Sequence, residues 1–161
     1  MLVPILKTLH VFGAMLFLGA GMMTAWYKVR ADRSGDLRVL TWYQREIVRA
    51  DWLFTAPSAV ILPVTGLWLA NIYGIPWHQG WVGWGLGGFL VSGILWVPAV
   101  WLQIRMRQMA EHALEHDEEL PSLFHRMNRI WMALGIPAFL LATFVIWMMV
   151  AKWSPTTSIL P

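Results

Sequence analysis

The fold of this chain is decided by residues 52–104, which read WLFTAPSAVILPVTGLWLANIYGIPWHQGWVGWGLGGFLVSGILWVPAVWLQI and contain no Asp, Glu, Lys or Arg. A helix that crosses the hydrocarbon core of a bilayer needs about 20 apolar residues. This stretch of 53 residues is therefore long enough for two crossings. Asn71, Gly74, Pro76 and Gly80 favour a tight turn between them, so we expect a helical hairpin.

Two further crossings flank this hairpin. Residues 130–151 form an uncharged stretch of 22 residues, and residues 2–27 carry a single charge, on Lys7. We predict an all-α bundle of four transmembrane helices, over residues 3–29, 52–73, 81–103 and 128–152. These helices use most of the 161 residues. We therefore expect a single transmembrane domain over residues 1–161, with no room for a nucleotide-binding fold.

The composition supports a membrane protein. Hydrophobic residues make up 58% of the chain and charged residues 13%, whereas a soluble domain carries about a quarter charged residues. The chain has no cysteine, which excludes disulfides, iron–sulfur clusters, thiol nucleophiles, thiolate-ligated haem and covalent haem attachment. The net charge of +3 is small, and the basic residues have an explanation in membrane topology. We expect no nucleic-acid partner.

The basic residues predict how the helices are oriented. Ten of the twelve lysines and arginines fall in the loops after the first and third predicted helices, at positions 28, 30, 33, 38, 45, 49, 105, 107, 126 and 129. By the positive-inside rule both loops are cytoplasmic, so both termini lie outside. Tryptophans near the predicted helix ends agree with this placement. We expect a multi-pass protein of the bacterial inner membrane that contacts lipid and whose wide apolar faces suit a homo-oligomer or a larger membrane complex.

Both cytoplasmic loops are expected to contain helix. Asp36 is a suitable N-cap for a short helix that we expect to lie on the membrane surface. The third transmembrane helix is expected to continue to Leu114 and to end in the acidic run 115–119 before Pro121, which is typical of a solvated face. The apolar face of the short helix would carry Leu37, Leu40, Tyr43 and Ile47.

The strongest candidate for chemistry is His10, about two to three turns inside the first predicted helix. Lys7 lies one turn earlier on the same face. An ionisable group at that depth is costly in a membrane and indicates a functional site. A neutral imidazole is a usual axial ligand of non-covalent haem, so His10 is a candidate ligand of haem b iron. The alternative is a core histidine that donates to a carbonyl or a threonine on a neighbouring helix.

Small residues and prolines suggest where a cofactor could approach. Gly85 and Gly88 belong to a glycine-rich stretch, residues 83–93, that would admit either a flat macrocycle or a closely packed neighbouring helix. Proline in a membrane helix is tolerated around a cavity, where hydroxyl groups can bond the freed carbonyls. The prolines are Pro57, Pro63, Pro98 and Pro137, and the available hydroxyl groups are those of Thr55, Ser58 and Thr65.

A second iron ligand is less obvious. His78, in the turn, is the other histidine predicted on the outer side, and Met148 is a further candidate; a five-coordinate iron is the third option. His112 and His116 have a spacing that can chelate a metal, but no third ligand is evident. Arg126 and Asn128 could bind an anionic group such as a propionate, a lipid headgroup or a quinone. Membrane anchoring, with pairing to Asp51, is the alternative.

Short motifs along nearly the whole chain resemble those of an uncharacterised bacterial family of four-helix integral membrane proteins. They are residues 6–14 (LKTLHVFGA), 54–57 (FTAP), 65–67 (TGL), 80–81 (GW) and 126–128 (RMN). More distantly, the chain resembles the HemJ-type protoporphyrinogen oxidase, a haem b membrane protein with its essential histidine at the position of His10. That resemblance implies haem ligation by His10 and redox chemistry in the membrane. It does not carry over the oxidase activity, because the lysine that follows Gly-Trp in that family is absent from residues 81–85 (WVGWG).

Two functions therefore remain. The first is a b-type haem redox protein that exchanges electrons with a quinone, a porphyrin or a partner subunit. The second is a cofactor-free accessory subunit or small-molecule permease in which Lys7 and His10 form hydrogen bonds within the bundle.

Overall fold

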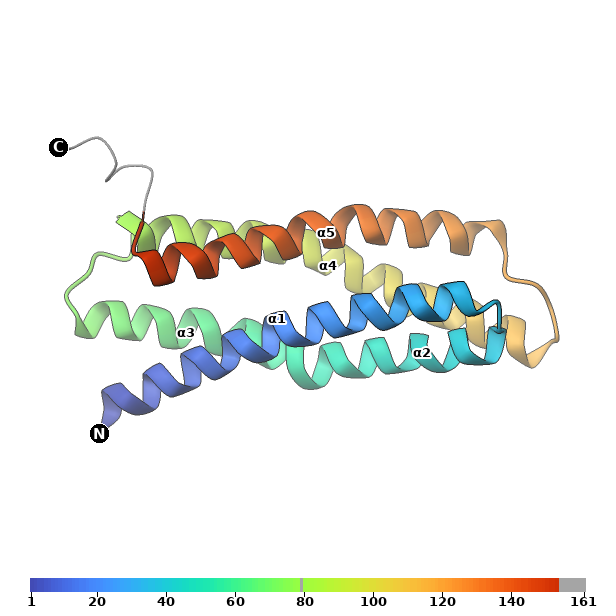
Figure 1. The fold of residues 1–161 in the computed structure, drawn as a ribbon, viewed down its shortest axis with the longest axis horizontal. Coiled ribbons are helices and arrows are strands. Elements are labelled where there is room, and N and C mark those ends of the chain that lie inside the picture. Colours follow the sequence, from blue (N-terminus) through green and yellow to red (C-terminus); the bar gives the residue numbers. More distant parts are fainter. Residues whose placement is uncertain (79, 154–161) are drawn as a thin grey trace.

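The computed structural model describes residues 1–78 and 80–153 and contains no strand among them (Figure 1). Residues 79 and 154–161, which also fall in the predicted single domain, lie outside the described residues. The elements are α1 (Leu2–Ser34), α2 (Leu37–Ala50), the π-helical turn η1 (Asp51–Thr55), α3 (Ala56–Ile72), α4 (Gly80–Glu115) and α5 (Ser122–Ala151). Within the described chain, four helices are long and apolar enough to cross a membrane: Leu2–Ser34, Leu37–Ile72, Gly80–Glu115 and Ser122–Ala151. The predicted all-α bundle is confirmed.

The helices are longer than predicted. α1 continues to Ser34, past the expected end near residue 29, and α5 begins at Ser122, before the expected start near residue 128. At 1.5 Å per residue, the 36 residues of α4 span roughly 54 Å, whereas the hydrocarbon core of a bilayer is about 30 Å thick. The bundle therefore extends past one membrane surface, and the extension carries most of the charged residues.

The prediction that the short helix after Asp36 lies on the membrane surface is wrong. Asp36 does cap α2, because its Oδ1 accepts from the backbone N–H of Arg38 at 2.7 Å. However, α2 runs through η1 into α3 as one continuous helix and packs along α1 and α4 (Figure 1). Its apolar face, with Tyr43 and Ile47, is buried against these helices. The apolar face of α2 was expected to contact lipid. It instead packs against the parts of α1 and α4 that extend beyond the predicted helix ends.

The π-helical turn η1 stands where α2 passes into α3. Its last bond runs from the backbone N–H of Ala56 to the carbonyl of Asp51, five residues back. Pro57 follows directly, and a proline has no N–H and crowds the carbonyl four residues before it. The wider turn removes that clash and rotates Asp51 toward the bundle interior, where it is buried. Turns of this kind are frequent at functional sites.

The helices pack in pairs. α1 lies mainly against α3 and α2, while α4 lies mainly against α5. The main apolar core, which includes Leu102, Met106, Phe124 and Trp131, sits in the half of the bundle near the α4–α5 connection. The first residues of α1, the last of α5 and the α3–α4 connection all lie at the opposite end, called here the terminal end (Figure 1). Large apolar side chains cover the outer faces of all four spans, as expected for helices in contact with lipid.

Candidate functional site

His10 lies on the face of α1 that packs against α3. Its Nδ1 is 2.9 Å from the Oγ1 of Thr65, and the same Oγ1 donates to the backbone carbonyl of Ile61 at 2.6 Å. The prediction had offered iron ligation or a hydrogen bond to a neighbouring threonine. The structure shows the hydrogen bond, which by itself does not exclude ligation, since ligating histidines usually donate their second ring nitrogen to a partner.

The two hydrogen bonds favour one tautomer of His10. A threonine hydroxyl carries one hydrogen, and Thr65 directs it to the carbonyl of Ile61, which can only accept. With the hydroxyl in that orientation, Nδ1 of His10 donates its own hydrogen to Thr65 Oγ1. In a neutral imidazole this leaves the lone pair on Nε2, the nitrogen on the far side of the ring. His10 is thus set up with one nitrogen held by the protein and the other able to accept a proton or a metal.

Gly66 leaves the space that the imidazole ring of His10 occupies. A Cβ at this position would lie 3.0 Å from Cε1 and 3.5 Å from Nδ1 of His10. That spacing is tighter than ordinary van der Waals contact, so any side chain would push the ring away from Thr65. Thr65 therefore orients the ring through a hydrogen bond, and Gly66 allows the ring to lie close to α3 because it has no side chain.

Three other predicted residues share the terminal end with His10. Lys7 is exposed, and its ammonium lies 5.2 Å from the ring centroid of Tyr73. His78 is exposed in the α3–α4 connection, where its ring meets the edge of Trp77, and Met148 is buried on α5. No hydrogen bond or ion pair among the described residues joins any of the three to His10.

The glycines of α4 lie against α5. A Cβ at Gly85 would come within 2.1 Å of Met149 Cε, and one at Gly88 within 2.7 Å of Val145 Cγ2. Close packing between α4 and α5, the alternative to a macrocycle, accounts for both glycines.

Arg126 and Asn128 lie at the other end of the bundle. Asn128 donates to Asp32 Oδ2 at 2.8 Å, and Arg126 is exposed. Asp32 and His10 are 22 positions apart on α1, which corresponds to roughly 33 Å. Arg126 and Asn128 are therefore too far from His10 to contact a haem bound there, whereas binding of another anionic group and membrane anchoring stay predictions for these two residues.

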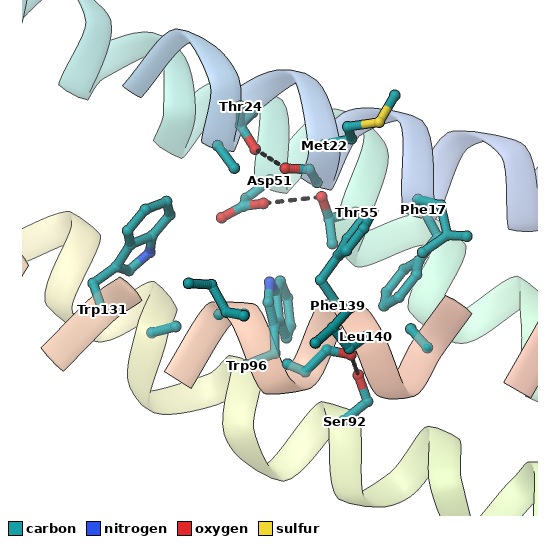
Figure 2. A pocket seen from close by; sticks show the side chains of 18 of the residues that line it. Phe17, Met22, Thr24, Asp51, Thr55, Ser92, Trp96, Trp131, Phe139 and Leu140 are labelled. Carbon is teal, nitrogen blue, oxygen red and sulfur yellow. Dashed lines mark hydrogen bonds between the residues drawn. The ribbon is translucent and has the colours of Figure 1, made fainter. Parts of the chain in front are cut away.

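Asp51 lines a cavity of about 260 Å³ between α1, η1, α4 and α5 (Figure 2). Thr55 donates to its Oδ1 at 2.9 Å, and no hydrogen bond of ordinary length reaches Oδ2 from the described residues, although the Gln103 amide lies beside the carboxyl group. Gln103 Oε1, in the same cavity, is also unpartnered. The two side chains are only 6% and 5% exposed. The expected pairing of Asp51 with the basic cluster of α5 does not occur in the described residues.

Sequence reasoning missed this cavity, although one signal was present. Buried polar residues recur at intervals of three, four or seven along α2, η1 and α3, which places them on one face of the continuous helix. Each is less than 9% exposed. A stripe of this kind in an otherwise apolar helix is a sign of polar function inside the bundle. Its members are Thr41, Gln44, Asp51, Thr55, Ser58 and Thr65.

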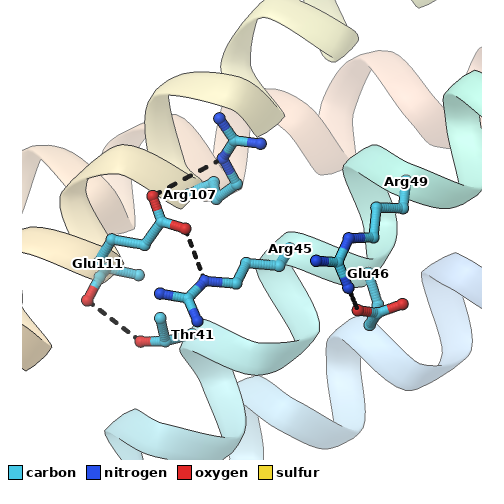
Figure 3. A network of polar contacts seen from close by, with 7 residues as sticks. Thr41, Arg45, Glu46, Arg49, Arg107 and Glu111 are labelled. Atoms are coloured by element: carbon cyan, nitrogen blue, oxygen red, sulfur yellow. Dashed lines mark hydrogen bonds and ion pairs between the residues drawn. The ribbon is translucent and has the colours of Figure 1, made fainter.

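The charged half of the bundle is joined by ion pairs that have a structural role. Arg45 of α2 contacts Glu111 of α4 at 2.6 Å, and Arg107 approaches the other oxygen of Glu111 at 3.9 Å (Figure 3). Thr41 donates to the carbonyl of Ala110 at 3.1 Å. These contacts hold α2 along α4, and none of the residues that form them lines the Asp51 cavity.

His112 lies in the last turn of α4, and His116 lies just after the helix ends. The one carboxylate that the described residues place near them is Glu118, whose Oε2 is 3.9 Å from His112 Nε2. The rings of His112 and His116 are 4.1 Å apart, and His116 Nδ1 lies 2.9 Å from the carbonyl of His112. Among residues 1–78 and 80–153, no group of three or more His, Cys, Asp or Glu side chains gathers closely enough to hold a metal ion.

Comparison with known proteins gives a family. A family model described as "Predicted integral membrane protein (DUF2269)" matches residues 4–153. The chain belongs to this family. Its description agrees with the four membrane-spanning helices, so the protein is an integral membrane protein. No curated protein and no solved structure matches the chain.

Proposed function

We propose that this protein binds haem b through His10 and works as a redox protein in the membrane. The observation that carries the proposal is the contact of His10 Nδ1 with a Thr65 hydroxyl that bonds the Ile61 carbonyl, which favours a tautomer with the lone pair on Nε2. Iron-ligating histidines have this arrangement, because the hydrogen bond on the second nitrogen orients the ring and raises its basicity. The resemblance to HemJ-type oxidases at residues 6–14 is a second, independent support.

Each residue at the terminal end has a role in this proposal. Thr65 orients the imidazole, and Gly66 leaves the space in which its ring lies. Lys7 is the cation nearest to His10 along α1 and would face an anionic propionate. His78 and Met148 lie at the same end and are the candidates for a sixth ligand. A haem held there would supply one-electron chemistry for a membrane-soluble substrate such as a quinone or a porphyrin.

The finer cellular placement is also a proposal. The positive-inside distribution favours a bacterial inner membrane with both termini outside. His10 would then lie in the outer half of the bilayer, and Asp51 would lie toward the cytoplasmic side.

The test is a visible spectrum of the full chain purified in mild detergent, oxidised and then reduced with dithionite. We expect a Soret band and reduced α and β bands that disappear in His10→Ala. His125→Ala is the matched control, because that histidine is exposed at the opposite end, and it should keep the full spectrum. Thr65→Val should keep the bands but weaken haem retention about tenfold or more, since it removes the hydrogen bond behind the ligand.

The contrary result is equally clear. A colourless wild-type protein that haemin cannot colour would overturn the haem proposal. The alternative, a cofactor-free accessory subunit or permease, would then remain. The Asp51 cavity would be its candidate site, because two unpartnered acceptors line it among the described residues.

A further inference from the structure

The cavity beside Asp51 is large enough for a small organic molecule. Its volume of about 260 Å³ exceeds the roughly 150 Å³ of an engineered cavity that binds benzene. In proportion, it has room for about ten non-hydrogen atoms. A single ordered water would leave most of this space empty.

The polar end of the cavity has two acceptors without a hydrogen bond among the described residues. Asp51 Oδ2 and Gln103 Oε1 are both acceptors, both are buried, and neither has a partner. Asp51 forms no ion pair with any described lysine, arginine or histidine. A buried carboxylate that no cation of the chain balances is costly. A ligand that brings positive charge and two N–H donors would correct both deficits.

The rest of the cavity is apolar and aromatic. Phe17, Trp96, Trp131 and Phe139 line it, and Figure 2 shows Asp51, Trp96 and Trp131 pointing into the same space. The faces of aromatic rings attract cations, and more strongly where water is excluded. The remaining lining residues are mostly small or aliphatic side chains, among them Leu18 and Ile136, which suit an apolar body.

We propose that this cavity binds a small lipophilic amine in its protonated form, with the ammonium group between Asp51 and Gln103 and the apolar body among the aromatic rings. The ammonium would donate to Asp51 Oδ2 and Gln103 Oε1. A divalent metal ion does not suit the site, because Ca²⁺ and Mg²⁺ take six or more oxygen ligands and this lining is mostly apolar. The π-helical turn η1 is the element that brings the carboxylate to the ligand.

The amine site is separate from His10. Asp51 and Thr65 are 14 positions apart on one continuous helix, about 20 Å along its axis. The inference does not rest on haem binding, and a colourless protein would leave it intact.

The experiment compares two ligands of nearly equal shape on the unaltered full chain in an uncharged maltoside detergent. Isothermal titration calorimetry measures binding of 2-phenylethylamine, which is cationic at neutral pH, and of 2-phenylethanol, its neutral counterpart. We expect the amine to bind about tenfold or more tightly than the alcohol, from the ion pair and the aromatic faces together. Equal affinities would overturn the proposal by showing an apolar cavity only, and so would absence of amine binding.

Variants then locate the binding. Asp51→Asn keeps the shape of the side chain and should reduce the affinity for the amine to that for the alcohol. Glu119→Gln removes an acidic side chain that is exposed and outside the cavity, so it should leave both affinities unchanged. Gln103→Leu should weaken amine binding by a smaller factor, because it removes one neutral acceptor. Amine binding that survives Asp51→Asn at full strength would contradict the proposed site.

Discussion

Asp32 and Asp51 are the same residue type in two regions of one bundle, and their surroundings are opposite. Asp32, near the end of α1, pairs through Oδ1 with Lys28 and accepts at Oδ2 from Asn128 of α5. Asp51, at the π-helical turn, has one oxygen bonded to Thr55 of its own helix and the other facing a cavity. The first carboxylate links two helices by hydrogen bonds, whereas the one such bond found for the second among the described residues lies within its own helix.

This difference indicates that Asp32 has a structural role and that Asp51 has a binding role. Lys28 is 1% exposed and also lies 5.4 Å from the ring centroid of Phe124, so its charge depends on Asp32. Asp32 therefore stabilises the fold. Asp51 has unused hydrogen-bonding capacity that lowers stability unless something outside the chain uses it. An unpartnered buried acceptor beside an open volume indicates a binding site more strongly than a carboxylate whose bonds are complete.

Asp32→Ala should have the largest effect on stability. It leaves the ammonium of Lys28 buried without its counter-ion, so we expect the free energy of unfolding to fall by about 3 kcal/mol. Thermal unfolding in detergent measures this. The double variant with Lys28→Met should recover most of the loss, because it removes the stranded charge. Failure of the second substitution to recover stability would show that Lys28 does not depend on Asp32.

Asp51→Leu should change stability in the opposite direction. It removes the unpartnered buried Oδ2 and fills part of the cavity, while Thr55 loses its acceptor at Oδ1, so we expect a net gain of about 1 kcal/mol. Thermal unfolding of the ligand-free protein in detergent measures this gain. Asp51→Asn is the control and should show no such gain, since it still buries a polar group. A loss as large as that of Asp32→Ala would mean that Asp51 has a partner in the fold.

Thr65→Val should cost about 1 kcal/mol in the absence of any cofactor. The substitution keeps the shape of the side chain but leaves the Nδ1–H of His10 without its acceptor. Thr143→Val is the matched control: that hydroxyl bonds only the carbonyl of Phe139 in its own helix, on an exposed face. Equal effects of the two substitutions would show that His10 contributes nothing through Thr65.

Glu111→Gln should have the smallest effect, about 0.5 kcal/mol. Its ion pair with Arg45 is partly exposed, and such pairs contribute little and are screened by salt. Unfolding of the variant and of the wild type should therefore differ at low ionic strength and converge in concentrated salt. A difference that salt leaves unchanged would show a packing role for Glu111.

Local sequence features predicted the fold well. The uncharged stretches fixed the four helices, Asp36 marked a real N-cap, and the predicted continuation of α4 to Leu114 is confirmed. These features depend on length, charge and capping, which are properties of neighbouring residues. The position of α2 was not predictable in the same way, because an apolar face with Tyr43 and Ile47 suits lipid and protein equally.

The candidate site was only partly predictable. His10 and Thr65 were both identified from the sequence, but their contact joins positions 55 apart. The contact of Asp32 with Asn128 joins positions 96 apart. The role of Gly85 depended on where α5 lies, and the cavity at Asp51 exists only because four elements meet around it. Such features arise from helix packing, to which a single sequence gives no direct access.

The most direct test of this account is to measure which ring nitrogens of His10 carry a hydrogen, because the haem proposal depends on a free lone pair on Nε2. ¹⁵N solid-state NMR of histidine-labelled, cofactor-free protein in lipid, with His10→Ala to assign the signals, reads the state of each ring nitrogen. The account predicts a neutral ring with hydrogen on Nδ1 and none on Nε2. A ring protonated on Nε2, alone or together with Nδ1, would contradict it, because Thr65 would then not hold the ring in the tautomer on which the haem proposal is built.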